Sequence, residues 1–503
     1  MTSKQLTPPE LLNALRQTVQ AGFPAAVSDL SRLVRIPSVS WEAFDARRVA
    51  ESADAVAELV RQLEVFDEVA VARAHIGDTD QLGQPAVLAT RAARNGKPTI
   101  LLYAHHDVQP PGADADWQSQ PFEPTVRGDR IYGRGAADDK AGVVAHLAAI
   151  RAFVATVGTD FDLGLALFIE GEEEFGSRSF KNFLLEHQEQ LAADVIVVAD
   201  SDNWDVDTPA LTVGLRGNVT FKLTVHTLAH ASHSGMFGGA IPDAMLAMVR
   251  LLATLHNDDG SVAVAGLSSR EAGTPEYSEE RLREESGLLD GVSPIGTGSI
   301  LGRIWSQPAI TVTGIDAPSV ANASNTLAPV ISVRVSVRIA PGQDSTEAFA
   351  ALERHLREHA PFGAKIDITD VDQGNGFLVD TTGWAVAEAE AAMADAWGTS
   401  PIEMGVGGSI PFIASLVDLF PAAQILVTGV EDPNSRAHSP NESLHLGVFH
   451  RAILTEAVLL ARLTERGPNS AGTAGQLPAG TAGQLPAGRG HGQYFQRFPR
   501  KRA

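Results

Sequence analysis

The sequence of 503 residues contains no cysteine, so disulfide bonds and thiolate metal sites are both excluded. It also lacks any apolar run near the roughly 20 residues that a helix needs to span a bilayer. Residues 1–10 are polar, contain two prolines and show no signal-peptide core. We therefore expect a cytoplasmic protein with no membrane partner.

Basic residues are scarce, because 39 Lys and Arg stand against 61 Asp and Glu and give a formal charge of −22. Such a surface repels nucleic acid phosphates, so we expect no nucleic-acid partner, and it leaves many carboxylates for binding cations. The exception is residues 467–503, which hold five Arg or Lys and no acid. The segment 472–479 is repeated there at 480–487, and we expect a disordered, low-complexity tail.

The hydrophobic pattern predicts two domains, because 503 residues exceed one ordinary core. Apolar strands at 98–104, 162–169 and 194–199 alternate with helices, which predicts an α/β domain whose mixed, mainly parallel sheet is flanked by helices. From residue 215 the strands alternate in polarity, as at 331–339, which predicts a smaller inserted α+β domain. We expect residues 1–214 and 377–466 to form the larger domain, 215–376 the insert and 467–503 the tail. Residues 9–65 should be helical, with interruptions at Pro24 and at 35–38.

Polar side chains follow each of the three apolar strands where it ends. His105 and Asp107 follow the first strand, Glu173 and Glu174 follow the second, and Asp200 follows the third. Ligands of open α/β sheets collect beyond the carboxyl ends of parallel strands, so these side chains should meet. Strand alternation places His105 and Asp107 on one face, and a carboxylate beside a histidine is what a metal-ligating imidazole needs.

These strand ends and two further segments supply a set of nitrogen and oxygen ligands, namely His105, Asp138, Glu174, Asp200 and His438. The set suits two divalent ions, with zinc as the first expectation and manganese or cobalt as alternatives. Three carboxylates, one of them bridging, and a bridging hydroxide would neutralise both ions. A dinuclear site activates a shared water and polarises a carbonyl, and a further carboxylate must then carry the proton to the leaving amine. Glu173 is the candidate for that role.

Six motifs in order carry a resemblance to a known family. They are Tyr103 to Pro110 (YAHHDVQP), Tyr132 to Lys140 (YGRGAADDK), Glu170 to Ser177 (EGEEEFGS), Ala199-Asp200, His233 to Gly239 (HSGMFGG) and Ala437 to Glu442 (AHSPNE). Over roughly residues 10–465 the chain resembles the aminoacylase/carnosinase family of dinuclear metallopeptidases, most closely its dipeptidase branch. The resemblance implies a catalytic α/β domain, an inserted ferredoxin-like lid and dimerisation domain, and a homodimer.

The resemblance also implies a role for each matching residue. One metal would be held by His105, Asp138 and Asp200, and the other by Asp138, Glu174 and His438. Asp107 would orient His105, and Glu173 would be the general base and acid. His233 would reach a dimer partner's active site to stabilise the oxyanion, and Arg338 would bind a substrate carboxylate. Asn325, Gly408 and Ser409 would lie on the substrate side.

The expected function is hydrolysis of the amide bond of dipeptides or short peptides, with a metal-bridged water activated by Glu173. One position departs from the carnosinase branch, where an acid often precedes the Gly-Gly-Ser loop, because residue 406 is a valine. This departure keeps an N-acyl amino-acid amidohydrolase as the alternative, so the substrate is a small peptide or an N-acyl amino acid. An inactive binding or scaffold protein would have lost ligands, whereas here every ligand and the base are present.

Other candidate ligands have ordinary structural interpretations. We expect five further histidines to pack or hydrogen-bond without binding a metal: His106, His146, His226, His230 and His445. Asp139 and Glu172 are interpreted as neighbours of the ligands. The glycine-rich segment 405–409 lacks the lysine and the spacing of a phosphate-binding loop.

Overall fold

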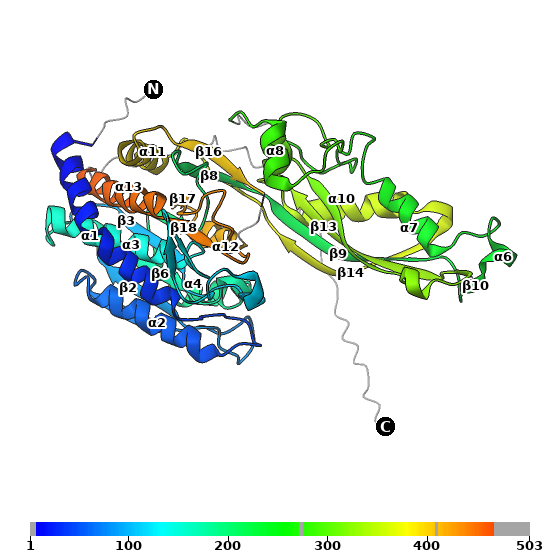
Figure 1. Cartoon of the computed structure of the whole chain (residues 1–503), viewed down its shortest axis with the longest axis horizontal. Coiled ribbons are helices and arrows are strands. Elements are labelled where there is room, and N and C mark those ends of the chain that lie inside the picture. The colour runs from blue at the N-terminus through cyan, green and yellow to red at the C-terminus, as the bar shows by residue number, and fades with distance from the viewer. Residues whose placement is uncertain (1–6, 271–274, 408–410, 467–503) are drawn as a thin grey trace, which may run out of the picture.

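The computed structural model describes residues 7–270, 275–407 and 411–466. The predicted disorder of residues 467–503 therefore lies outside the described residues. The chain forms two bodies, each built on its own sheet (Figure 1). The larger sheet has the strand order β1-β2-β6-β3-β7-β17-β8-β15, with β16 paired to β8. Its strands are β1 (Glu68–Ala72), β2 (Ala86–Arg91), β3 (Thr99–His105), β6 (Gly164–Glu170), β7 (Val195–Ala199), β8 (Ala210–Leu215), β15 (Phe377–Leu378), β16 (Ile402–Val406) and β17 (Gln424–Thr428).

The larger sheet is mixed, as predicted, with a parallel centre. Strands β6, β3, β7 and β17 are parallel neighbours, whereas β1, β2 and β6 pair antiparallel. Every residue of β6 and β7 is buried, which explains why both strands are continuous apolar runs in the sequence. Because the central strands run in one direction, their carboxyl ends lie together at one edge of the sheet.

Helices cover both faces of this sheet. On one face lie α1 (Pro9–Val34), α2 (Ala46–Arg61), α3 (Lys140–Val157), α11 (Trp384–Trp397) and α13 (Leu446–Glu465). On the other face lie α4 (Phe180–Glu186), α5 (Gln188–Leu191) and α12 (Pro411–Leu419). Local sequence sets some helix ends. Asp45, for example, caps α2 by accepting a hydrogen bond from the Arg47 amide, and Gly398 ends α11 in a left-handed conformation.

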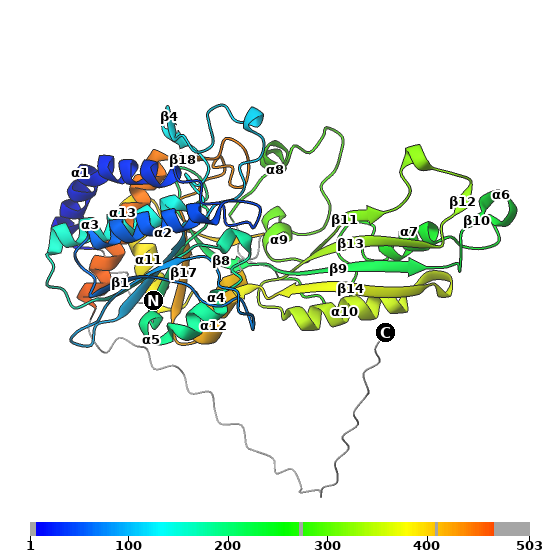
Figure 2. The same cartoon turned by 90° about the horizontal axis from the view of Figure 1, so that it is seen from below.

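The smaller sheet belongs to the inserted segment and has the strand order β11-β13-β9-β14. Its elements follow one another as β9 (Gly217–His226), α7 (Ala244–Ala253), β11 (Ala309–Asp316), β13 (Val330–Ile339), α10 (Ser345–Glu358) and β14 (Lys365–Gly374). All its pairs are antiparallel, and this βαββαβ order is the predicted ferredoxin-like arrangement. α7 and α10 pack on one face through Leu251, Leu352 and Val335 (Figure 2).

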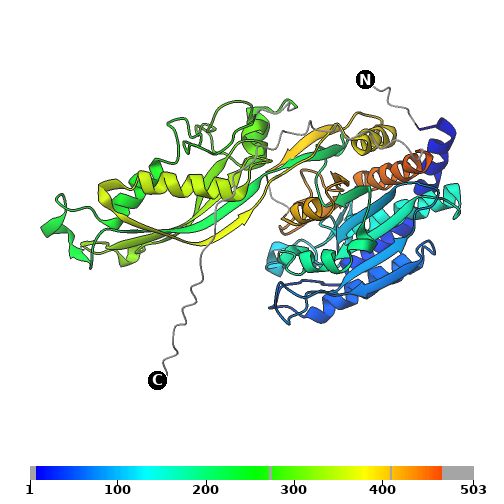
Figure 3. The same ribbon diagram turned by 180° about the vertical axis from the view of Figure 1, so that it is seen from behind.

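The two sheets are joined by strand pairs that run from one into the other (Figures 1 and 3). Residue 216 alone separates β8 from β9, and residues 375–376 separate β14 from β15. Shorter elements lie at the edges and in the connections: η1 (Asp114–Asp116), β4 (Thr125–Arg127), β5 (Arg130–Tyr132), η2 (Glu173–Phe175), β10 (Ser232–His233), α6 (Ser234–Phe237), α8 (Glu279–Ser286), α9 (Ile300–Trp305), η3 (Val320–Asn322), β12 (Thr326–Leu327), η4 (Pro361–Gly363) and β18 (Ser443–His445).

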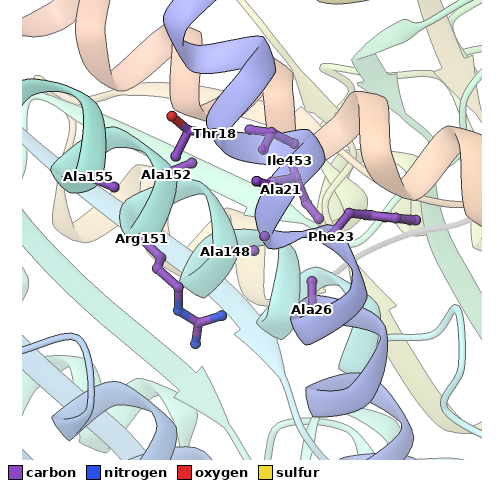
Figure 4. A pocket seen from close by; sticks show the side chains of 11 residues that line it. Thr18, Ala21, Phe23, Ala26, Ala148, Arg151, Ala152, Ala155 and Ile453 are labelled. Carbon is purple, nitrogen blue, oxygen red and sulfur yellow. The ribbon is translucent and has the colours of Figure 1, made fainter.

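The predicted interruption of the first helix at Pro24 is wrong, because α1 continues through it to Val34. Apolar residues on both sides of the proline, including Leu15, Val19 and Leu30, are buried, and this packing keeps the helix continuous. Small side chains around the proline leave a cavity of about 330 Å³ between α1, α3 and α13 (Figure 4).

Helix α3 is apolar and long enough to cross a membrane by length and composition. In the fold 72% of its 18 residues are buried, as expected for a core helix between the sheet and the outer helices. Among the described residues it is the only helix that passes this test.

Candidate metal centre

The carboxyl ends of three parallel strands bring acidic and imidazole side chains together. His105 ends β3, the Glu173–Glu174 pair begins the turn η2 after β6, and Asp200 directly follows β7. Atoms of His105, Asp138 and Glu174 lie within 4.8 Å of one another, and so do atoms of His105, Glu173 and Asp200. Since His105 belongs to both groups, the two clusters are adjacent.

Asp138 lies between the two imidazoles, with one oxygen toward each. Its Oδ1 is 3.1 Å from Nε2 of His105, and its Oδ2 is 2.9 Å from Nε2 of His438. His438 Nε2 is also 3.2 Å from Oε2 of Glu174. On the opposite side, Nε2 of His105 is 4.0 Å from Oδ1 of Asp200. A carboxylate placed this way can bridge two cations, each with one histidine and one further carboxylate.

Glu173 lies beside this arrangement. Its Oε2 is 4.0 Å from Nε2 of His105, and its side chain is 18% exposed, so it borders the cluster and also reaches solvent. That position is open to a water molecule and to a substrate, as a group that transfers protons requires.

Asp107 positions the ring of His105 and also the main chain of Glu173 and Glu174. Its main-chain oxygen is 3.1 Å from Nδ1 of His105, and its Oδ1 is 3.4 Å from the same nitrogen. Its carboxylate accepts hydrogen bonds from the amides of Glu173 and Glu174, both at 3.1 Å, and from Oγ of Ser40 at 2.7 Å. One buried carboxylate thus holds the His105 ring and the turn that carries both glutamates.

Glu442 is a functional candidate that sequence reasoning missed. Its carboxylate accepts hydrogen bonds from the amides of Gly135, Ala137 and Asp138 at 2.9–3.1 Å, and from Nη1 of Arg134 at 2.6 Å. It therefore fixes the loop that presents Asp138 from a position four residues after His438. The signal was its presence in the motif at 437–442, but only the fold shows which amides it binds.

Two more side chains hold ligands from outside the cluster. The amide of His105 donates to Oδ2 of buried Asp139 at 3.0 Å, and Gln109 donates to Glu174 from its main chain at 3.1 Å and its side chain at 2.7 Å. Asp139 is thus a neighbour of the ligands, as expected. Glu172 is also buried and accepts hydrogen bonds from Ser179, so it too has a supporting role.

The electrostatics of the cluster favour a cation. Hydrogen bonds to Asp138 and Glu174 raise the pKa of His438 to about 11. Burial acts to raise the pKa of Asp138, but hydrogen bonds from His105 and His438 outweigh it and hold that pKa well below its usual range. The carboxylate of Asp138 therefore stays ionised, and its negative charge stabilises positive charge at the imidazoles of His105 and His438.

The other carboxylates are crowded and poorly solvated. Burial, reinforced by the charge of Asp138, raises the pKa of Glu174 to about 7, and burial raises the pKa of Asp200 to about 6. Burial also raises the pKa of Glu173 well above its usual value. A pair of divalent ions would relieve this repulsion, and imidazole and carboxylate are donors that such ions accept. The residues present therefore fit the metal pair that the motifs imply.

The family follows from a comparison with known proteins. A model of peptidase family M20/M25/M40 matches residues 101–463. The chain belongs to this family. The resemblance found in the motifs is thereby confirmed, and the protein is a hydrolase of a metallopeptidase family.

Relatives and solved structures agree with this placement. The chain is 36% identical to a cysteinylglycine-S-conjugate dipeptidase of Corynebacterium striatum over 369 residues, which cover 72% of this chain and 80% of the relative. It is 29% identical to the Cys-Gly metallodipeptidase dug1 of Schizosaccharomyces pombe, covering 88% and 96%. The crystal structure of human carnosine dipeptidase 1 has the same fold, with a TM-score of 0.71 at 23% identity, covering 92% of this chain and 100% of that one.

The lid of this M20 peptidase carries three further predicted site residues, His233, Asn325 and Arg338, and the structure does not bring all of them to the metal centre. His233 and Asn325 lie at the end of the lid farthest from the larger sheet, where β10 pairs with β12 and the Ser234 amide donates to the Asn325 carbonyl (Figure 1). Arg338 lies at the other end of β13, opposite Asn218 at the start of β9. Gly408 and Ser409 lie outside the described residues.

The five histidines that we did not expect to bind a metal belong to neither group of candidate metal ligands around His105. His106 is buried against the Pro85 carbonyl, and burial lowers its pKa to about 4. His146 contacts Glu456 and the carbonyl of Tyr103. The other three contact surface partners: His226 contacts Asp367, His230 the Ala231 carbonyl, and His445 contacts Asp129.

Proposed function

We propose that this M20 peptidase hydrolyses the amide bond of dipeptides or short peptides that end in a free carboxylate. The observation that carries the proposal is Asp138, whose two oxygens face His105 and His438 while Glu173 borders the same cluster. The named relatives, which are dipeptidases, support the substrate class.

Two divalent ions are proposed to occupy the cluster. One would be held by His105, Asp138 and Asp200, and the other by Asp138, Glu174 and His438, with zinc preferred over manganese or cobalt. When bound, the ions supply Lewis acidity, which lowers the pKa of a nearby water and polarises the scissile carbonyl. Asp107 keeps the ring of His105 in place, because it contacts Nδ1 and leaves Nε2 facing the cluster.

Glu173 is proposed as the proton carrier. It takes a proton from the attacking water and returns it to the leaving nitrogen. Burial raises its pKa, so the group binds a proton more readily than an exposed glutamate, which suits a base that must also act as an acid.

The lid is proposed to complete the site. Arg338 offers a planar guanidinium for the substrate carboxylate. Asn325, beside His233 at the far end of the lid, is a further proposed substrate contact, and the larger domain is proposed to add Gly408 and Ser409. His233 lies at the far end of the lid, so we propose that it serves the active site of a second subunit in a homodimer and stabilises the oxyanion there. The domain boundaries after residues 214, 376 and 466, and the cytoplasmic location, stay predictions.

An N-acyl amino-acid amidohydrolase is the second candidate. Val406 is the last residue of β16, whereas relatives in the carnosinase branch often carry an acid at this position, where it could meet the ammonium of an unblocked dipeptide. Adding zinc, manganese or cobalt to metal-stripped protein and assaying dipeptides beside N-acyl amino acids separates the two. Cleavage of unblocked dipeptides supports the first function, and cleavage of the acylated compounds alone supports the second.

The role of Glu173 is tested by Glu173→Gln. We expect kcat to fall by roughly 10²–10⁴-fold, while the metal content and the thermal unfolding midpoint stay near those of the unaltered protein. Glu186→Gln, on the exposed side of α4, is the matched control and should keep full activity. Retained turnover in Glu173→Gln would show that another group carries the proton.

A further inference from the structure

A cavity of about 680 Å³ is lined by residues between 216 and 311, all within the inserted lid segment. Its lining residues come mainly from the strand β11 and from the long excursion between α7 and β11, which includes α8 and α9. Figures 1 and 2 show where these elements lie. None of its lining residues belongs to the metal-type groups around His105. A cavity of this size holds a small organic molecule.

The walls of the cavity are mostly apolar. Six of the lining side chains are Val262, Val264, Leu267, Leu282, Ile295 and Ile310, and serines and threonines lie between them. Such walls favour a ligand with an aliphatic or aromatic body, because its apolar surface leaves water on binding.

The charges around the cavity have one sign. Arg216, Arg303 and His256 line it, and no Asp or Glu is among the described lining residues, although the whole chain has 61 acids against 39 basic residues. The guanidinium of Arg303 already has hydrogen-bond partners within the protein, because it donates to the carbonyls of Ile295 at 3.0 Å and Gly298 at 2.8 Å.

Arg216 uses only part of its hydrogen-bonding capacity within the described residues. Its Nε donates to the Gly407 carbonyl at 3.3 Å, and no carboxylate among the described residues forms an ion pair with it. Burial, followed by the nearby charge of Arg338, lowers the pKa of Arg216 to about 10. This half-buried guanidinium, with one carbonyl partner, is therefore a donor for which the described part of the chain supplies no anion.

The cavity between α1, α3 and α13 shows the contrast. It is lined largely by alanines (Figure 4). Arg151 is the charged residue among its described lining residues, and it pairs with Asp29 at 3.2 Å. Nothing there calls for a charged ligand. The lid cavity differs because its apolar walls and its partly occupied arginine act together.

We propose that the lid cavity is a binding site for an organic anion, in which a carboxylate pairs with Arg216 and an apolar body packs along the walls. The planar guanidinium can meet a carboxylate through two parallel hydrogen bonds. This site is additional to the hydrolytic function proposed above, and its binding can be measured without turnover.

The test is calorimetric titration of the full-length, metal-loaded protein with 4-methylpentanoate, which has a carboxylate and an aliphatic body. We expect saturable binding of one molecule per chain. The neutral 4-methylpentanamide should bind at least about tenfold more weakly, and Arg216→Gln should weaken binding of the carboxylate by a similar factor.

Two further variants make the result specific. Arg334→Gln alters an exposed arginine of the same sheet, which donates to the Asp370 carbonyl at 3.0 Å, and should leave binding unchanged. Leu282→Trp fills the cavity from α8, a helix with no buried residue, and should abolish binding without lowering the unfolding midpoint. Equal binding by Arg216→Gln, absence of binding at millimolar concentration, or loss of binding when the metals are stripped would overturn the proposal.

Discussion

At the scale of the residue, the metal centre depends on carboxylates that would not themselves bind a metal. Asp107 and Glu442 are both fully buried, and they accept two and three hydrogen bonds, respectively, from main-chain amides of the loops that carry proposed ligands. A carboxylate in such a position fixes the geometry of the metal centre, because its hydrogen bonds determine where the neighbouring loops lie.

Asp107→Asn tests this positioning. The new amide group faces amide donors of Glu173 or Glu174, so at least one hydrogen bond becomes a donor–donor contact. We expect roughly 10–100-fold weaker metal binding, measured by competition with a chelator, and a parallel loss of kcat. Ser40→Ala removes only the hydroxyl that donates to Asp107 and should have a smaller effect. Unchanged metal affinity in Asp107→Asn would contradict the positioning role.

Glu170 makes stability depend on pH. Burial raises its pKa to about 8, and the Tyr103 hydroxyl donates to its Oε2 at 2.6 Å. In the unfolded chain this carboxyl ionises near its ordinary pKa of 4.5, so between these two pKa values unfolding releases a proton. The free energy of unfolding therefore falls as pH rises across this interval.

Glu170→Gln removes that ionisation. The variant should be more stable than the unaltered protein at pH 8, by roughly 2 kcal/mol or more, and the difference should vanish toward pH 4. Urea unfolding at several pH values measures it, with Glu186→Gln as a control that should show no such trend. A difference independent of pH would refute the assignment.

At the scale of the element, helix ends hold the layers of the larger body together. Lys140 begins α3 and is fully buried, and its Nζ donates to the carbonyls of Leu33 at 2.9 Å and Ile36 at 2.6 Å, at the end of α1. Burial lowers the pKa of this lysine to about 7. The contact joins α1 to the start of the helix that directly follows Asp138 and Asp139.

Lys140→Met should remove the hydrogen bonds that join these two helix ends and so destabilise the protein. Two buried carbonyls would lose their donor, and we expect the free energy of unfolding to fall by roughly 3 kcal/mol. Lys181→Met, at an exposed position of α4, should change it by less than about 0.5 kcal/mol. Denaturant unfolding of both variants gives the comparison, and equal stabilities would show that the buried contact contributes little.

At the scale of the whole molecule, the lid extends away from the larger body and places His233 at its far end (Figure 1). Apolar side chains near that end are exposed: Met236 by 74%, Leu246 by 48% and Val249 by 56%. Exposed apolar side chains close to a histidine expected at an active site support the proposed homodimer, since a second copy could cover them.

Mixed dimers test whether one subunit completes the site of the other. Glu173→Gln and His233→Ala should each give a nearly inactive homodimer. When the two variants are unfolded and refolded together, mixed dimers contain one site with both an intact Glu173 and an intact His233, so part of the activity should return. If the mixture stays as inactive as its components, His233 acts within its own chain or not at all.

Much of the fold was predictable because its signals are local. The buried strands β3, β6 and β7 are continuous apolar runs, and the alternation in β13 marks a sheet with one exposed face. The helix through Pro24 was not predictable, since the packing that holds it comes from α3 and α13, more than a hundred residues away in sequence. Local preference for a break was outweighed by tertiary burial.

The sequence by itself determined the kinds of group that meet at the metal centre, because strand periodicity and parallel strand order bring His105, Glu174 and Asp200 to one edge of the sheet. Only the tertiary structure decided which distant carboxylates hold them, as Glu442 does across some 300 residues, and that His233 lies apart from the cluster of its own chain. It also decided that Arg216 borders a cavity without a carboxylate partner among the described residues. The physical reason is that hydrogen-bond partners and burial depend on contacts between distant segments, which no local pattern records.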